Sequence, residues 1–218
     1  MTAEQPERVR LGPSGISVGD RTVPFLAGSV HYFELARTAW RPSLEALRAA
    51  GAHLVDVVVP WNVHELSRGE FDFGHDNPRL DVTRFVALAK DVGLFVVLRP
   101  GPRVATGLTF DGIPERVVWD DACQARSAGN APVIVPSLPL GYPLSSQASR
   151  AFHEEAALWL AAVAERLGPL AWPNGPIVLV HLDADRSLPF YGGPYDTDYH
   201  QRSEERRVGK ECRTRWSP

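Results

Sequence analysis

Cysteine is scarce in this sequence, which contains only Cys123 and Cys212 among its 218 residues. Two isolated cysteines form neither a disulfide framework nor the ligand spacing of a metal site. Long apolar runs are also missing, and none approaches the roughly 18 residues that a transmembrane helix needs. Residues 1–10 contain two glutamates and no apolar stretch, unlike a secretory signal peptide. We therefore expect a protein of the reducing cytoplasm with no metal, no cofactor and no membrane partner.

A strong excess of positive charge is absent as well. The formal net charge is −3, and 22% of the residues are charged. Nucleic acids are bound mainly through clustered Lys and Arg, so this balance argues against a nucleic-acid partner. The chain is long enough for one domain with a sizeable core, and 44% of it is hydrophobic.

Residues 202–218 differ from the rest in composition. They hold six Lys and Arg, three Glu and three apolar residues. A solvated basic tail and a nucleic-acid-binding arm are two interpretations. We prefer a third, because the string resembles the translation of a sequencing adapter. The sequence is accordingly divided into residues 1–201 and a non-native tail, 202–218, for which we expect no fixed structure.

The body of the chain alternates between two kinds of apolar pattern. Continuous, largely β-branched runs predict buried strands over 23–30, 53–60, 94–98 and 177–182. Apolar residues with helical spacing predict helices over 40–50, 85–92 and 152–167. Such alternation is typical of βαβ units and a parallel sheet, either an open doubly wound sheet or half of a barrel. The first strand is not followed by a Gly-rich phosphate loop, which weakens the doubly wound alternative.

Polar side chains follow directly after each predicted strand. His31 and Tyr32 follow the first strand, and Asn62 and Glu65 the second; Arg99 ends the third, and Asp183 and Asp185 end the fourth. In a (β/α)₈ barrel these positions form the face that carries the active site. The pattern therefore favours α/β architecture comprising the first half, about four βα units, of a TIM (β/α)₈ barrel.

Several segments, in order and in register, are similar to those of the family 35 β-galactosidases. They are GSVHYF (28–33), LRAAGAHLVDVVVPWNVHE (47–65), FDF (71–73), LRPGP (98–102), GIPERVVWD (112–120) and GPIVLVHLDAD (175–185). The resemblance covers about residues 9–200 and implies a retaining, exo-acting glycoside hydrolase of β-linked galactose or a related sugar. It places an acid/base glutamate after strand 4 and a nucleophilic glutamate after strand 7.

Asp185 occupies the acid/base position, where the family has glutamate, and the nucleophile has no counterpart in this sequence. Among the other polar residues, we expect Tyr32, Asn62, Glu65 and Asp183 to contact the sugar. For Asn62 and Glu65 a buried structural network is an alternative. Arg99 is expected to pair with a carboxylate, either Glu65 or Asp56.

The sequence also departs from the family pattern where the sugar is bound. Val58 replaces a frequent tyrosine, Gly107 a glutamate, and Ala184 an asparagine. The shorter Asp185 withdraws its carboxyl group by about 1.5 Å, enough to cost roughly 10²-fold in rate. A non-catalytic carbohydrate-binding relative is therefore the alternative function. A half barrel leaves unpaired edges and an uncovered face, so we expect these 218 residues alone to be poorly soluble and inactive.

Overall fold

The computed structural model describes residues 8–104, 107–135, 141–182 and 198–199. Its main sheet consists of the parallel strands β4 (Ala27–Ser29), β5 (Leu54–Val58), β8 (Phe95–Gly101) and β11 (Ile177–Leu182). Their order across the sheet is their order in the chain, so each strand pairs with its successor. The three predicted strands that correspond to β5, β8 and β11 are confirmed to within three residues at each end.

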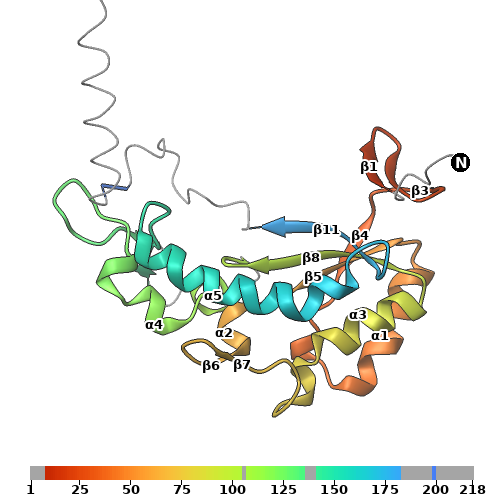
Figure 1. Cartoon of the computed structure of the whole chain (residues 1–218), viewed down its shortest axis with the longest axis horizontal. Coiled ribbons are helices and arrows are strands. Elements are labelled where there is room, and N and C mark those ends of the chain that lie inside the picture. Colours follow the sequence, from red (N-terminus) through yellow and green to blue (C-terminus); the bar gives the residue numbers. More distant parts are fainter. Residues whose placement is uncertain (1–7, 105–106, 136–140, 183–197, 200–218) are drawn as a thin grey trace, which may run out of the picture.

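Helices α1 (Arg37–Ala49), α3 (Val82–Asp91) and α5 (Arg150–Leu167) all lie on the same side of this sheet (Figure 1). A doubly wound fold has helices on both faces and reverses its strand order at a switch point. The described residues show neither feature, so the doubly wound alternative is not supported. The mixed α/β class with a parallel sheet is confirmed.

Local sequence explains where two of these helices begin. The Asp81 carboxylate accepts a hydrogen bond from the Arg84 backbone nitrogen at 2.9 Å and caps α3. The Ser149 hydroxyl oxygen accepts one from the Phe152 nitrogen at 3.1 Å and caps α5. Such caps satisfy backbone donors that have no partner within the helix.

The predicted strand over 23–30 is wrong in its extent. Residues 21–23 form β3, and the main sheet begins only at Ala27, after a turn in which the Leu26 nitrogen donates to the Pro24 carbonyl. Pro24 has no N–H to give to a ladder, which explains the interruption. β3 (Arg21–Val23) completes an antiparallel sheet with β1 (Val9–Gly12) and β2 (Gly15–Val18), for which the sequence predicted no strands.

The connections contain short elements. After β4 comes η1 (Tyr32–Glu34), and after β5 come α2 (Trp61–His64), β6 (Glu65–Ser67), β7 (Glu70–Phe71) and η2 (Pro78–Leu80). The connection after β8 contains η3 (Thr109–Gly112), α4 (Glu115–Val118), η4 (Asp121–Cys123), β9 (Ile134–Val135) and β10 (Tyr142–Pro143), and η5 (Gly168–Leu170) follows α5. In the described part of the chain, no helix is both long and apolar enough to cross a membrane.

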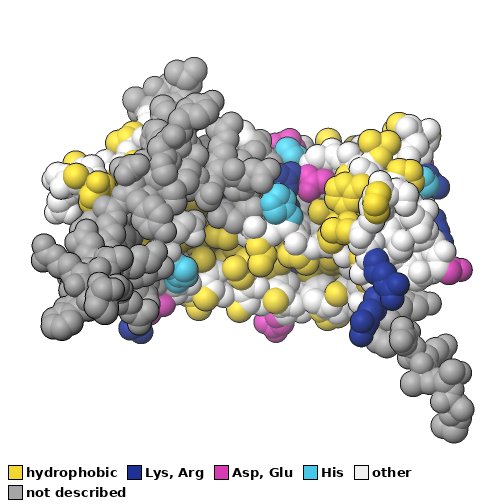
Figure 2. All heavy atoms as spheres, turned by 90° about the horizontal axis from the view of Figure 1, so that it is seen from above, with side chains coloured by type: hydrophobic (Ala, Val, Ile, Leu, Met, Phe, Trp, Pro, Cys, Tyr) yellow, Lys and Arg dark blue, Asp and Glu magenta, His cyan; other side chains and the backbone are white. Residues whose placement is uncertain are grey.

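The two faces of the main sheet are covered differently. The helix side carries the larger hydrophobic cluster, which includes Trp40, Trp61 and Trp159, all 0–1% exposed. On the other face, the β1–β3 sheet covers one end, where Ile16 packs in a small cluster with Leu54. Figure 2 looks onto that face and shows hydrophobic side chains gathered in a band across it.

Candidate functional site

An ion pair lies on the face of the sheet that the helices do not cover. Arg99 on β8 donates from Nη2 to Oδ2 of Asp56 on β5 at 2.5 Å, and from Nε to Oδ1 at 3.2 Å. Both side chains are about one-fifth exposed. A bidentate guanidinium–carboxylate pair fixes both groups in orientation as well as position. Of the two partners expected for Arg99, the structure gives Asp56.

Tyr32 lies in the core of the helix side and not on an open surface. It is 0% exposed, and its hydroxyl is 2.5 Å from Nε2 of His64, which is equally buried. A 3₁₀ turn after β4 carries Tyr32 inward, where its ring packs against Trp40 and Phe85. In this structure Tyr32 therefore contacts no solvent-accessible site, and its observed role is packing.

The tautomer of His64 follows from its partners. Its Nδ1 lies 2.7 Å from the Asp72 carbonyl oxygen, which can only accept, so Nδ1 carries the proton. Nε2 therefore accepts from the Tyr32 hydroxyl. Burial lowers the pKa of His64 to about 4 and raises the pKa of the Tyr32 hydroxyl. Both side chains are thus neutral near pH 7.

Asp72, in the middle of the FDF segment, organises the loop that follows. Its carboxylate accepts hydrogen bonds from the backbone nitrogens of Gly74 at 2.8 Å, His75 at 2.7 Å and Asn77 at 2.8 Å. Burial alone would raise the pKa of Asp72, but these backbone donors outweigh burial and lower it. The sequence pattern indicated a family motif here and did not reveal this structural role.

Glu65 belongs to a network of ion pairs at the end of β5. Arg116 on α4 donates from Nη2 and Nε to the two carboxylate oxygens of Glu65 at 2.6 and 3.0 Å. Arg116 also pairs with Glu155 on α5 at 2.7 Å, and Arg68 donates to the same Glu155 at 2.7 Å. The Glu65 side chain is only 5% exposed. The structural-network alternative for Glu65 is therefore what the structure shows.

Asn62 is the expected sugar-binding residue that retains an unused polar atom. Its Nδ2 donates to the Thr109 carbonyl oxygen at 3.1 Å, whereas its Oδ1 is buried and has no hydrogen-bond partner among the described residues. A buried acceptor without a partner costs free energy, and such groups often mark sites that a ligand or water satisfies. Asn62 thus remains a candidate binding residue.

The loop after β8 carries Asp111, whose carboxylate contacts two other side chains. Phe110 and Asp111 both adopt positive φ, 56° and 53°, which is uncommon for residues with a side chain. Tyr142 donates its hydroxyl to Asp111 at 2.8 Å, and Arg103 lies 3.8 Å from the same carboxylate. Backbone of this kind persists where surrounding contacts fix it, as at many active sites. The local sequence signalled neither this conformation nor these partners.

Comparison with known proteins identifies the group to which this arrangement belongs. The model of glycosyl hydrolases family 35 matches residues 16–131, more than half of the chain. The chain belongs to that family. The match spans the sheet from β2 to β8 and the loops that carry Asn62, Glu65 and Asp111.

Individual relatives agree with this assignment. Human β-galactosidase-1-like protein 2 is 31% identical over 75% of the chain, and mouse β-galactosidase is 28% identical over 80%. A crystal structure of β-galactosidase from the psychrophilic Marinomonas ef1 superposes with a TM-score of 0.53 at 19% identity, covering 73% of this chain and 21% of that one. The chain spans only 22–23% of the length of the two curated relatives.

Two of the departures from the family pattern, Val58 and Gly107, fall on described residues. Val58 is fully buried at the end of β5. Gly107 has φ +76°, a conformation in which the family's glutamate would be strained.

Cys123 is a free, buried thiol whose pKa is raised to about 12 by burial and by Asp120 and Glu155. It is therefore an unreactive thiol at neutral pH.

The expected residues at the end of the fourth strand, Asp183, Ala184 and Asp185, lie outside the described residues. So does the tail, 202–218. Within the described part of the chain, no group of three or more His, Cys, Asp or Glu side chains could hold a metal ion.

Proposed function

We propose that the chain contributes the first half of a (β/α)₈ barrel to a retaining glycoside hydrolase of the β-galactosidase type. Its substrate class is a terminal β-linked galactose or a related sugar. The observation that carries the proposal is the match to glycosyl hydrolases family 35 on a singly wound parallel sheet. Strands in chain order with all helices on one face are what half of a barrel requires.

The geometry supports an active site at the carboxyl ends of the strands. β11 lies beside β8 and ends at Leu182, three residues before Asp185. Asp56 and Arg99, fixed to each other on the uncovered face, would form part of the polar interior beneath the site. We propose that the Asn62 amide oxygen and Asp183 contact sugar hydroxyls, because a sugar offers donors to these acceptors.

Each step of retaining hydrolysis assigns a task to one carboxyl group. Asp185, protonated, would donate its proton to the glycosidic oxygen while a second carboxylate attacks the anomeric carbon. Water then attacks the covalent intermediate, and Asp185 takes up the proton of that water. The second carboxylate must lie about 5–5.5 Å from the first and would come from later strands of the longer protein.

Asp185 can be tested in the full-length protein by the choice of leaving group. Asp185→Ala should lower the rate with an alkyl or disaccharide galactoside by roughly 10²–10⁴-fold, because those leaving groups need a proton. With 2,4-dinitrophenyl galactoside the glycosylation step, which kcat/KM reports, needs no acid, so the loss of kcat/KM should be far smaller. Asp185→Glu should raise the rate on poor leaving groups. Equal losses on both substrates would contradict the assignment.

A non-catalytic carbohydrate-binding role is the second candidate. Val58 is buried where the family often has tyrosine, and Gly107, with its positive φ, stands where the family has glutamate. Neither residue would supply the sugar contact expected at its position. A full-length protein that binds galactose but does not hydrolyse any β-galactoside would establish this alternative. The division at residue 202 and a cytoplasmic location remain predictions.

A further inference from the structure

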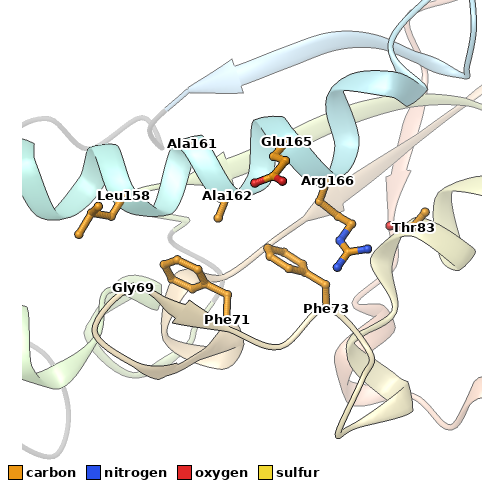
Figure 3. Close-up of a pocket in the computed structure, with 9 residues that line it drawn as sticks. All are labelled: Gly69, Phe71, Phe73, Thr83, Leu158, Ala161, Ala162, Glu165 and Arg166. Carbon is orange, nitrogen blue, oxygen red and sulfur yellow. The ribbon is translucent and has the colours of Figure 1, made fainter.

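A cavity lies on the helix side of the sheet, on the opposite side from the Asp56–Arg99 pair. It has a volume of about 660 Å³ and is bounded by the β6–β7 hairpin, α3 and α5. Figure 3 shows its lining residues: Gly69, Phe71, Phe73, Thr83, Leu158, Ala161, Ala162, Glu165 and Arg166. This volume lies in the range of small-molecule binding sites.

The floor of the cavity is aromatic and held in place from behind. The Phe73 ring stacks on Trp159 with centroids 5.9 Å apart and an interplanar angle of 11°. Phe71 packs on the same Trp159 at 5.3 Å. Trp159 is fully buried, and its Nε1 donates to the Pro100 carbonyl oxygen at 2.6 Å. Two ring surfaces are therefore fixed in advance, so a ligand would not have to order them.

The walls supply space and polar groups. Ala161 and Ala162 on α5 leave room above the two phenylalanine rings (Figure 3). Glu165 and Arg166 are exposed at the rim, and neither forms an ion pair with a described residue. The Arg166 guanidinium carbon lies 5.6 Å from the centre of the Phe73 ring. Thr83 Oγ1 is buried and has no hydrogen-bond partner in the part of the chain that the structure describes.

This combination matches one ligand chemistry. An apolar molecule would leave Thr83 Oγ1 without a partner, and a charged ligand would meet Glu165 and Arg166 with opposite effects. A pyranose ring has C–H groups that can lie against an aromatic ring and hydroxyls that pair with a carboxylate, a guanidinium and a hydroxyl. The opposite charges of Glu165 and Arg166 suit a neutral sugar.

We propose that this cavity binds a neutral pyranose unit of an oligosaccharide or polysaccharide, as a non-catalytic site separate from the site at the strand ends. The proposal goes beyond the proposed hydrolase activity and does not depend on Asp185. It provides the protein with a second point of attachment to a carbohydrate chain, which raises the local concentration of that chain near the strand ends.

The test is calorimetric titration of the full-length protein with β-1,4-galactotetraose while the galactose site is saturated with 1-deoxygalactonojirimycin. We expect residual tetraose binding, weakened at least tenfold by the double variant Glu165→Ala/Arg166→Ala, as for loss of a charged hydrogen bond. Hydrolysis of a small chromogenic galactoside should be unchanged in this variant. The matched control, Arg150→Ala/Glu154→Ala, removes an exposed pair from the same helix outside the cavity and should bind like wild type.

Absence of tetraose binding with the inhibitor present would overturn the proposal. Unchanged affinity in the Glu165→Ala/Arg166→Ala variant would also overturn it. A protein that binds the tetraose in this way but hydrolyses no galactoside would uphold the cavity site and refute the proposed enzymatic function, so the two failures are distinguishable. Leu158→Arg, at a position 44% exposed, blocks the cavity from its open side and should abolish the residual binding.

Discussion

The two faces of the main sheet differ in what covers them. The helix face is closed by α1, α3 and α5 over a cluster with three fully buried tryptophans. The opposite face has a small cluster at one end and the Asp56–Arg99 pair, and the edge strand β11 leaves Val180 and Leu182 55% and 62% exposed. Buried apolar surface is therefore concentrated on the helix face, whereas the other face carries an ion pair and only a small apolar cluster.

Trp159→Ala should produce the largest loss of stability, because Trp159 joins α5, the FDF segment and the Pro100 carbonyl. Removing a buried tryptophan typically costs about 3–5 kcal/mol. The neighbouring Leu158→Ala, at an exposed position, should cost less than about 1 kcal/mol. Chemical denaturation of both variants measures the difference. Similar losses for the two would contradict a helix face stabilised by its buried side.

Acidification should destabilise the helix face through His64. Burial lowers its pKa in the folded protein to about 4 from 6.5, so the unfolded chain binds a proton between these pH values that the folded chain does not. Stability therefore falls as the pH falls through this window, by about 3 kcal/mol at pH 4. His64→Gln keeps hydrogen-bonding groups without titrating and should lose that part of the pH dependence. Identical pH profiles would refute the neutral, buried His64.

Arg116→Met should lower the stability of the fold less than Trp159→Ala does. It leaves the carboxylates of Glu65 and Glu155 without their shared partner, although Arg116 is itself one-third exposed. We expect the free energy of unfolding to fall by about 2–3 kcal/mol, less than for a fully buried pair, because Arg116 is partly exposed. The control Arg150→Met removes an exposed partner of Glu154 and should cost about 0.3–0.5 kcal/mol. Denaturation midpoints that do not separate the two variants would mean that the network adds little.

Charges on the edge strand β11 should have the smallest effect. Val180→Lys and Leu182→Lys place a charge where the side chains already face solvent, so we expect changes within about 0.5 kcal/mol in the 218-residue chain. Its solubility should rise, because exposed apolar patches promote association. Thermal denaturation measures the change in stability, and sedimentation after expression measures the change in solubility. A large loss of stability would show that these two side chains are covered in the isolated chain.

Sequence patterns predicted the strands β5, β8 and β11 and the helices α1, α3 and α5. Each of these elements has a continuous or helical apolar pattern over several residues. They failed at β1–β3, whose strands have only three or four residues, and at Pro24, where one predicted strand became two. Glu65 and Arg116 are 51 residues apart in the chain, so no local spacing revealed their pairing. Tyr32 and His64 are 32 residues apart, so no local pattern revealed that the Tyr32 hydroxyl lies buried beside His64.

Under the proposed function, later strands of the longer protein would cover the open face and bring a second carboxylate to the site. The most direct test is to observe by proton NMR which anomer of galactose the full-length protein releases first from a β-galactoside. A retaining barrel enzyme with two closely spaced carboxyl groups releases the β-anomer, which then converts slowly to the α-anomer. Initial release of the α-anomer, or no galactose at all, would contradict the account.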